Sequence, residues 1–378
     1  MTPQLRSIVV LHEPPLREGR ASGRCVIAML RGLRMHGVDV RALAARQQFA
    51  VAGDPPRDLP IEVVDVPPEP PGWRARARRL RRPVGELVRS DFADRVREEV
   101  RSADVLHLEE VETAWLDLDI ATPSLLRLQY FVRWDRPLGP PWRREFRHVV
   151  EFELAERAAM RSHATFIAAS PAVAEEIRRR RPGAEVALVP LCLDPADYPP
   201  APLDGPPTAG IVGTASWPPT AGAMRRLVAG VWPEVRRLVP DARLAIAGRG
   251  TDALGLDGAG VDVLGEVPSA VEFLRTLSVL LYPIARGSGV KVKTLESLAV
   301  GLPIVTTPLG AEGVEAGDGA VIEADSVALA RAAASLLRDE GERRQRAAAS
   351  RAAFEAHYSP LPATAPLVEL YARLAERG

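Results

Sequence analysis

The chain has 378 residues, with 49 basic and 49 acidic side chains, so its formal net charge is zero. This length accommodates about two or three domains, and 47% hydrophobic with 26% charged residues is typical of a globular protein. A neutral chain gives no general electrostatic reason to bind nucleic acid, and we expect no such partner. Cys25 and Cys192 are too far apart in sequence to indicate a disulfide framework or a cysteine-rich metal site.

No apolar run approaches the ~20 residues of a membrane span, and the apolar stretch near the N-terminus is too short for a signal peptide. We therefore expect a cytoplasmic protein. Short apolar runs alternate with amphipathic segments of helical length, as in βαβ units of a parallel sheet that is covered on both faces. In the first half the predicted strands are 7–11, 38–43, 61–66, 105–108, 124–128, 165–169 and 186–189, and the predicted helices are 25–35, 146–160 and 171–180.

A proline-rich segment, residues 198–210, interrupts this alternation. Its five prolines fix φ and remove backbone donors, which predicts an interdomain linker and hinge. The alternation then resumes, with predicted strands at 210–212, 243–247, 261–264, 279–282, 304–307 and 320–322. The predicted helices are 221–238, 269–277, 290–300, 326–338, 341–357 and 367–377.

The sequence thus predicts an α/β protein with two doubly wound domains, residues 1–200 and 201–360. Ligands of such sheets bind at the carboxyl ends of the strands, and a cleft between two domains is the natural site.

Residues 281–314 contain the most informative pattern. A strand ends near Pro283, a loop with Gly287 and Gly289 follows, and a helix begins next. Glycines allow backbone amides to approach a ligand closely, and a helix N-terminus carries partial positive charge, so the combination predicts a phosphate site. Lys291 and Lys293, the only two lysines of the chain, lie at the start of this helix. Cations oppose the helix dipole there, unless an anion arrives to neutralise both.

Glu296 lies one helical turn beyond Lys293, on the same side of the helix. A carboxylate beside a phosphate site can accept hydrogen bonds from sugar hydroxyls. With a diphosphate at Lys293 and a ribose or sugar diol at Glu296, the two residues would form a binding site for a nucleotide sugar. The alternative is an ordinary surface ion pair between residues three apart.

Residues 210–314 resemble the donor domain of the GT-B glycosyltransferases, in particular the retaining group called family four or group one. The similar stretches are 211–219, 239–250, 263–267, 287–296 and 301–314, in the family's order and spacing. The N-terminal half resembles the family more weakly, through Gly19 and Gly23 in a strand–loop–helix start and His107 at a strand end.

The resemblance implies a GT-B fold, with two Rossmann-like domains facing a central cleft and a C-terminal helix, 361–378, that crosses back to the first domain. It implies transfer of a hexose from a nucleoside-diphosphate sugar, with retention and without a bound metal or cofactor. The acceptor, a small molecule, a lipid-linked molecule or a glycan, would enter from the N-terminal domain. Lys293 is the first and Lys291 the second choice to stabilise the leaving diphosphate, and Glu296 would hold the ribose.

The catalytic residues implied in this way are Lys293, Glu296, Gln129 and His107. The implied donor-binding residues are Gly213, Thr214, Arg249, Leu264, Gly265, Ser288, Gly289, Val290, Lys291, Lys293 and Glu296, and those expected at the acceptor are Gly19, Gly23 and Glu109. The alternative to a functional role is a structural histidine for His107 and a solvated charge in a loop for Glu109.

Two positions depart from the family pattern. Ser288 stands where the family has a glutamate, eight residues before Glu296, so direct carboxylate contact with the donor sugar is missing. Gln129 stands where the family often has a histidine, and an amide can form hydrogen bonds but cannot carry charge. The sequence therefore leaves open a nucleotide-sugar epimerase, a pseudo-glycosyltransferase, or a catalytically silent nucleotide-sugar-binding protein.

An arginine-rich segment, 74–82, allows weak peripheral contact with a membrane, although a solvated basic segment is the favoured interpretation.

Overall fold

The computed structural model describes residues 4–18, 21–47, 53–68, 72–73, 77–78, 81–89, 91–117 and 119–378. The chain divides into two compact units. Unit 1 consists of Met1–Arg133, Pro137–Cys192 and Pro360–Gly378, and unit 2 of Trp134–Arg136 and Leu193–Ser359. No helix in the part of the chain that the structure describes is long and apolar enough to cross a membrane.

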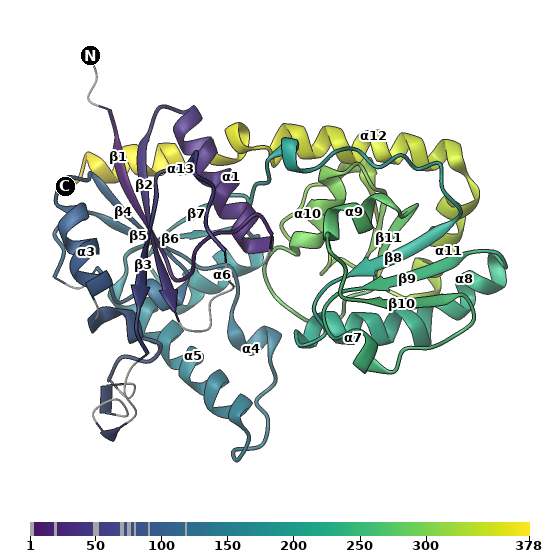
Figure 1. The fold of residues 1–378 in the computed structure, drawn as a ribbon, viewed down its shortest axis with the longest axis horizontal. Coiled ribbons are helices and arrows are strands. Elements are labelled where there is room, and N and C mark those ends of the chain that lie inside the picture. Colours follow the sequence, from purple (N-terminus) through teal and green to yellow (C-terminus); the bar gives the residue numbers. More distant parts are fainter. Residues whose placement is uncertain are drawn as a thin grey trace. The chain divides into compact units, whose positions relative to one another are not determined.

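Unit 1 contains a seven-stranded parallel sheet in the order β3-β2-β1-β4-β5-β6-β7 (Figure 1). Each predicted strand begins within one residue of an observed strand, so this part of the prediction is confirmed. The central strands β1 and β4 are buried, except for Arg6 at the start of β1, as their apolar runs predict. The strands are β1 (Arg6–Leu11), β2 (Asp39–Gln47), β3 (Ile61–Val66), β4 (Val105–Glu109), β5 (Ser124–Arg127), β6 (Thr165–Ala168) and β7 (Glu185–Leu188).

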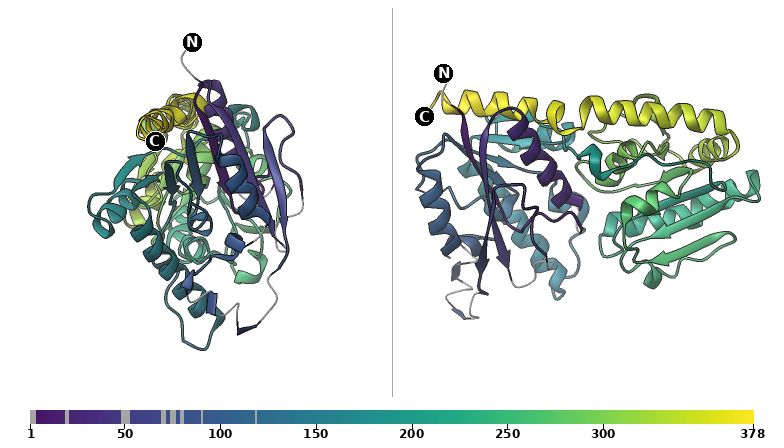
Figure 2. Two further views of the ribbon diagram at one scale, coloured as in Figure 1. Left: turned by 90° about the vertical axis from the view of Figure 1, so that its left-hand side faces the viewer. Right: turned by 45° about the horizontal axis from the view of Figure 1, so that its top comes forward.

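The helices of unit 1 include the last helix of the chain, which packs against the first (Figures 1 and 2). A Cβ at Gly32 would lie 2.4 Å from the Pro360 carbonyl oxygen, so only glycine permits this close approach. The helices are α1 (Ala21–Met35), α3 (Asp91–Val100), α4 (Val132–Asp135), α5 (Arg144–Ser162), α6 (Pro171–Arg180) and α13 (Pro360–Ala375), with 3₁₀ turns at Glu86–Arg89 and Val111–Thr113.

Unit 2 contains a six-stranded parallel sheet in the order β10-β9-β8-β11-β12-β13. The strands are β8 (Thr208–Val212), β9 (Arg243–Ala247), β10 (Val261–Gly265), β11 (Val279–Tyr282), β12 (Ile304–Thr306) and β13 (Ala320–Ile322). The helices are α7 (Pro218–Arg226), α8 (Trp232–Leu238), α9 (Ala270–Arg275), α10 (Val292–Ala299), α11 (Ser326–Arg338) and α12 (Glu340–His357), with 3₁₀ turns at Pro195–Asp197, Asp252–Leu254 and Gly317–Gly319.

The segment 198–210 differs from the predicted linker at its first residue. Tyr198 is fully buried in unit 2, where its backbone carbonyl accepts a hydrogen bond of 2.8 Å from Arg351. The chain passes from unit 1 to unit 2 at Cys192–Leu193, before the proline-rich segment begins. The start of this segment is therefore part of the packed unit 2.

Both sheets reverse their strand order at one point, between β1 and β4 in unit 1 and between β8 and β11 in unit 2. Loops diverge at the carboxyl ends of the strands on either side of such a point and leave room for a ligand. In unit 2 these loops contain Gly213, directly after β8, and residues 283–291, between β11 and α10. The predicted phosphate-binding residues therefore lie at the switch point of the second sheet.

Candidate functional site

The Lys293 ammonium lies beside the loop that follows β8. A Cβ at Gly213 would be 3.4 Å from Lys293 Nζ and 2.8 Å from the Thr220 side chain, so glycine keeps this space open. Nζ lies 3.4 Å from the Thr220 hydroxyl and 4.7 Å from the centroid of the Tyr282 ring. Within the described part of the chain, Lys293 forms no ion pair. The direct contacts of this partly buried ammonium, the Thr220 hydroxyl and the Tyr282 ring, are therefore neutral groups, where a counter-ion would be expected.

The pKa of Lys293 reflects this environment. Burial lowers the pKa, Glu296 raises it and the charge of Lys291 lowers it, to about 8 overall. The charge of Lys293 thus destabilises the unliganded protein, and a bound anion would remove this destabilisation. Thr220 and Tyr282 were not predicted from sequence, because neither belongs to a charged or glycine-rich motif.

Lys291, the second choice to stabilise the diphosphate, has a different environment from Lys293. It precedes α10 and is buried, its Nζ donates a hydrogen bond to the Gly289 carbonyl, and it lies 3.3 Å from Glu312 Oε2. Burial lowers the pKa of Lys291, whereas the ion pair with Glu312 raises it. Lys291 is therefore neutralised within the protein, and Lys293 is the lysine without a carboxylate partner among the described residues.

Ser288 is buried and engaged by a carboxylate that the sequence did not predict at this site. Asp135, the last residue of α4, belongs to unit 2 and is 2% exposed. Its Oδ1 accepts hydrogen bonds from the Ser288 amide, at 2.6 Å, and from the Ser288 hydroxyl, at 3.0 Å. Asp135, 153 residues away in sequence, thus places a carboxylate beside Ser288.

Glu296 lies in α10 with its side chain buried, and its Oε1 accepts a hydrogen bond of 3.0 Å from the Tyr198 hydroxyl. A buried carboxylate held in this way does not match the alternative of an ordinary surface ion pair with Lys293.

The remaining donor-site candidates lie in the loops at the carboxyl ends of neighbouring strands. Gly289 adopts φ +68° and Gly265 φ +67°, conformations that favour glycine. Thr214 is exposed, Val290 is partly buried, and Leu264 is 52% exposed. Arg249 is exposed and forms an ion pair with Glu266 at 2.9 Å. These residues follow β8, β9, β10 and β11 or end those strands, so the fold gathers them at one edge of the sheet.

A buried polar network occupies the corresponding edge of unit 1. His107 Nε2 lies 3.0 Å from Glu109 Oε1, which also accepts a hydrogen bond of 2.9 Å from Arg127 Nε. His107 Nδ1 lies 2.5 Å from the hydroxyl oxygen of Tyr371 in α13. Burial opposes ionisation of Glu109, but Arg127 and His107 keep the pKa of its carboxyl below the usual value.

Burial lowers the pKa of His107, although Glu109 raises it. His107 is fully buried, the position expected of a structural histidine. Glu109 is 3% exposed and is the last residue of β4, so the alternative of a solvated loop charge is wrong. Arg127, which the sequence did not single out, is the partner of Glu109.

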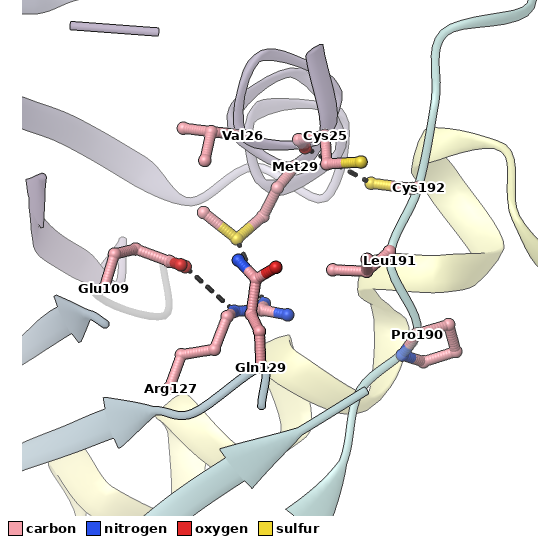
Figure 3. Close-up of a pocket in the computed structure, with 9 residues that line it drawn as sticks. All are labelled: Cys25, Val26, Met29, Glu109, Arg127, Gln129, Pro190, Leu191 and Cys192. Carbon is pink, nitrogen blue, oxygen red and sulfur yellow. Dashed lines mark hydrogen bonds and ion pairs between the residues drawn. The ribbon is translucent and has the colours of Figure 1, made fainter. Parts of the chain in front are cut away.

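A pocket lies beside this network (Figure 3). Gln129 and Arg127 are its polar side chains near β5, and the two cysteines approach each other across it, with Cys192 Sγ 3.9 Å from the Cys25 carbonyl oxygen. The lining residues are Cys25, Val26, Met29, Glu109, Arg127, Gln129, Pro190, Leu191 and Cys192. The fold thus brings together two cysteines that are remote in sequence.

Gly23 lies in α1, where a Cβ would be 2.9 Å from the backbone nitrogen and oxygen of Leu16, so close packing accounts for this glycine. Gly19 and most of the arginine-rich segment 74–82 lie outside the described residues. No cluster of three or more potential metal ligands of the His, Cys, Asp or Glu type occurs among the residues whose placement is described.

Comparisons with known proteins identify a family for part of the chain and a fold for the whole of it. Residues 206–339 match the family model described as Glycosyl transferases group 1. No curated protein sequence matches the chain. Sucrose-phosphate synthase from Thermosynechococcus elongatus is similar in structure, with a TM-score of 0.70, 15% identity and coverage of 100% of both chains.

Two other solved structures give similar values. Anabaena HepE in complex with UDP and glucose has a TM-score of 0.66 and 14% identity, over 97% of this chain and 99% of that chain. The α,α-trehalose 6-phosphate synthase from Burkholderia multivorans has a TM-score of 0.65 and 16% identity, over 99% and 98%. Residues 206–339 therefore form a domain of the glycosyl transferases group 1 family, within a chain that has the GT-B fold of two Rossmann-like domains.

Proposed function

We propose that the chain transfers a hexosyl group from a nucleoside-diphosphate sugar, bound by unit 2, to a hydroxyl group of an acceptor. The acceptor is a small molecule, a lipid-linked molecule or a glycan. In this proposal the reaction proceeds with retention at the anomeric carbon and uses no bound metal or other cofactor. The similarity of residues 206–339 to the group 1 family supports both the reaction class and retention.

The single observation that carries the proposal is the environment of Lys293. Its ammonium is partly buried, lacks a carboxylate partner among the described residues and lies within reach of the space above Gly213. A diphosphate placed there would receive a charged hydrogen bond from Nζ, worth ~1.5–3 kcal/mol. Negative charge grows on the diphosphate as its bond to the sugar breaks, so this bond strengthens during the reaction.

The solved structures that resemble the chain support a nucleotide sugar as the donor. HepE has been solved with UDP and glucose, and also with UDP-glucose. HepE and this chain are 14% identical.

A thermal-shift screen tests donor binding. UDP, ADP, GDP and their glucose esters are added in turn, and a ligand that binds the native state raises the melting temperature by mass action. We expect a clear rise in melting temperature with the nucleotides of one base. In calorimetry, Lys293→Ala should bind these nucleotides at least about tenfold more weakly than the wild type. A wild-type protein that binds none of these compounds would contradict the proposal.

A turnover assay then distinguishes the possible activities. Consumption of the nucleotide sugar only when an acceptor is present supports transfer, and the anomeric configuration of the product, read by NMR, tests retention. Conversion of the donor without an acceptor would show an epimerase. Donor binding with no turnover across acceptor mixtures would show a silent binding protein.

A further inference from the structure

Asp135 is a buried carboxylate that the proposed reaction, as described so far, does not use. Its neighbours Trp134 and Arg136 fix the segment to unit 2. Arg286 Nε donates a hydrogen bond of 3.3 Å to the Trp134 carbonyl oxygen, and the Arg136 guanidinium lies 4.9 Å from the centroid of the Trp217 ring. The segment is therefore attached both to the loop before α10 and to the start of α7.

The carboxylate itself lies against the loop that contains Gly287 and Ser288. A Cβ at Gly287 would be 3.5 Å from Asp135 Oδ1 and 3.5 Å from Lys291 Cε. The charge of Asp135 also acts on Tyr282, the residue whose ring lies beneath Lys293 Nζ. Asp135 thus lies against the glycine-containing loop that the sequence predicts to bind the donor diphosphate.

Asp135 forms no ion pair with any described residue, and only Ser288 stabilises its charge through hydrogen bonds. Burial raises the pKa of Asp135 to about 6, although Ser288 and the charge of Lys291 pull it down. A buried carboxylate without an ion-pair partner is costly, so a ligand that supplies further hydrogen-bond donors to it would relieve that cost. Diphosphate oxygens are negative and accept hydrogen bonds, which excludes them as the natural partner of this carboxylate.

Sugar hydroxyls, by contrast, are neutral donors that suit a carboxylate acceptor. In a nucleotide sugar a single oxygen joins the sugar to the terminal phosphate, so the hydroxyls lie within a few bonds of the diphosphate. We propose that the Asp135 carboxylate accepts hydrogen bonds from hydroxyl groups of the donor's sugar and thereby selects an intact nucleotide sugar over the free nucleoside diphosphate. This inference rests on the proposed function of unit 2.

The test compares two ligands in calorimetry, UDP and UDP-glucose, with ADP or GDP and their glucose esters as replacements if the screen selects another base. The variants are Asp135→Asn, which keeps the size of the side chain and an oxygen for Ser288, and Asp241→Asn. Asp241 is an exposed carboxylate before β9, at the amino ends of the strands, and serves as the matched control.

For Asp135→Asn we expect the affinity for the nucleotide sugar to fall about 10-fold to 100-fold, with less than about a threefold change for the diphosphate. Asp241→Asn should change neither affinity. The terminal phosphate of the free diphosphate also loses a proton near this range, so the ratio of nucleotide-sugar to diphosphate affinity is compared between the wild type and Asp135→Asn at each pH. Between pH 5 and pH 7, as Asp135 loses its proton, the wild-type ratio should rise relative to that of the variant. A purely structural role for Asp135 would not move this ratio.

Equal losses for both ligands, or no loss for either, would overturn the inference while leaving the proposed function intact. Tighter binding of the diphosphate by Asp135→Asn would also overturn the inference, because it would show that the Asp135 charge opposes binding of the diphosphate. A wild-type protein that binds none of the nucleotides would instead overturn the proposed function, and the inference with it.

Discussion

Replacing the two lysines by methionine should change stability in opposite directions. Burial, with a smaller contribution from the charge of Lys291, lowers the pKa of Lys293 from 10.5 to about 8, although Glu296 raises it. Each pKa unit corresponds to ~1.4 kcal/mol. The charged side chain therefore destabilises the unliganded fold by ~3 kcal/mol as an upper bound. Methionine has no charge to bury and packs well against an aromatic ring such as that of Tyr282.

The net gain should be smaller, because Lys293→Met also removes the cation–π contact with Tyr282 and the hydrogen bond to Thr220. We expect the variant to be more stable than the wild type by ~1–2 kcal/mol at pH 7, measured by urea unfolding. Lys291→Met should instead destabilise the protein, because it leaves the Glu312 carboxylate largely buried without its cation.

The pH dependence gives the sharper test. Below pH 8 Lys293 is protonated in both the folded and the unfolded state, so its full cost is present. Between about pH 8 and 10.5 the unfolded chain binds more protons, and wild-type stability gains relative to Lys293→Met as pH rises. The advantage of the variant should therefore shrink across this window. A variant that is less stable than the wild type at pH 7, or an advantage that does not vary with pH, would refute the reasoning.

Two other features should respond to single substitutions. Gly248→Ala would place a Cβ 2.1 Å from the Gly213 carbonyl oxygen, and we expect a loss of ~3 kcal/mol or more in urea unfolding. Gly255→Ala is the control, because Gly255 has φ +62° and open space around it, so this variant should lose only about 1–2 kcal/mol. Equal losses of stability in the two variants would contradict the steric argument. Arg127→Met should lose ~3–5 kcal/mol, because Glu109 keeps a buried charge, and adding Glu109→Gln should restore part of this. Wild-type stability of the single variant would show that the pair is unimportant for the fold.

The strands were predictable because their signal is local. Runs such as those of β4 and β11 are apolar throughout and buried on both faces, which also indicates a parallel sheet. Helix ends were less predictable where proline intervenes. The predicted helix 221–238 is broken by a π-helical turn at Leu227–Val231, since Pro233 lacks an N–H and clashes with the preceding turn.

The last helix shows the same limitation. The helix expected at 367–377 begins at Pro360. Pro360 and Pro362 lie in its first turn, where backbone donors are not used, whereas Pro366 lies inside the helix. The helix Asp91–Val100 was not predicted at all, although its apolar positions pack onto unit 1.

The candidate site was predictable only in part. The glycines and lysines of residues 287–293 form a continuous motif, and their place at the end of β11 follows from the alternation of strands and helices. Which lysine lacks a partner depends on Glu312, and the carboxylate at Ser288 comes from Asp135. These pairings join loops that are distant in sequence, and no local pattern encodes them. The meeting of Cys25 and Cys192 is unpredictable for the same reason.

The most direct test of the Lys293 site is the affinity for the selected nucleoside diphosphate as a function of pH. Calorimetry between pH 7 and 9.5 would compare the wild type with Lys293→Met. We predict that wild-type affinity falls as pH rises above about 8, because the free protein loses the Lys293 charge, and that the variant binds weakly at every pH. Tight binding that is independent of pH, or undiminished in Lys293→Met, would contradict the assignment of Lys293 as the diphosphate anchor.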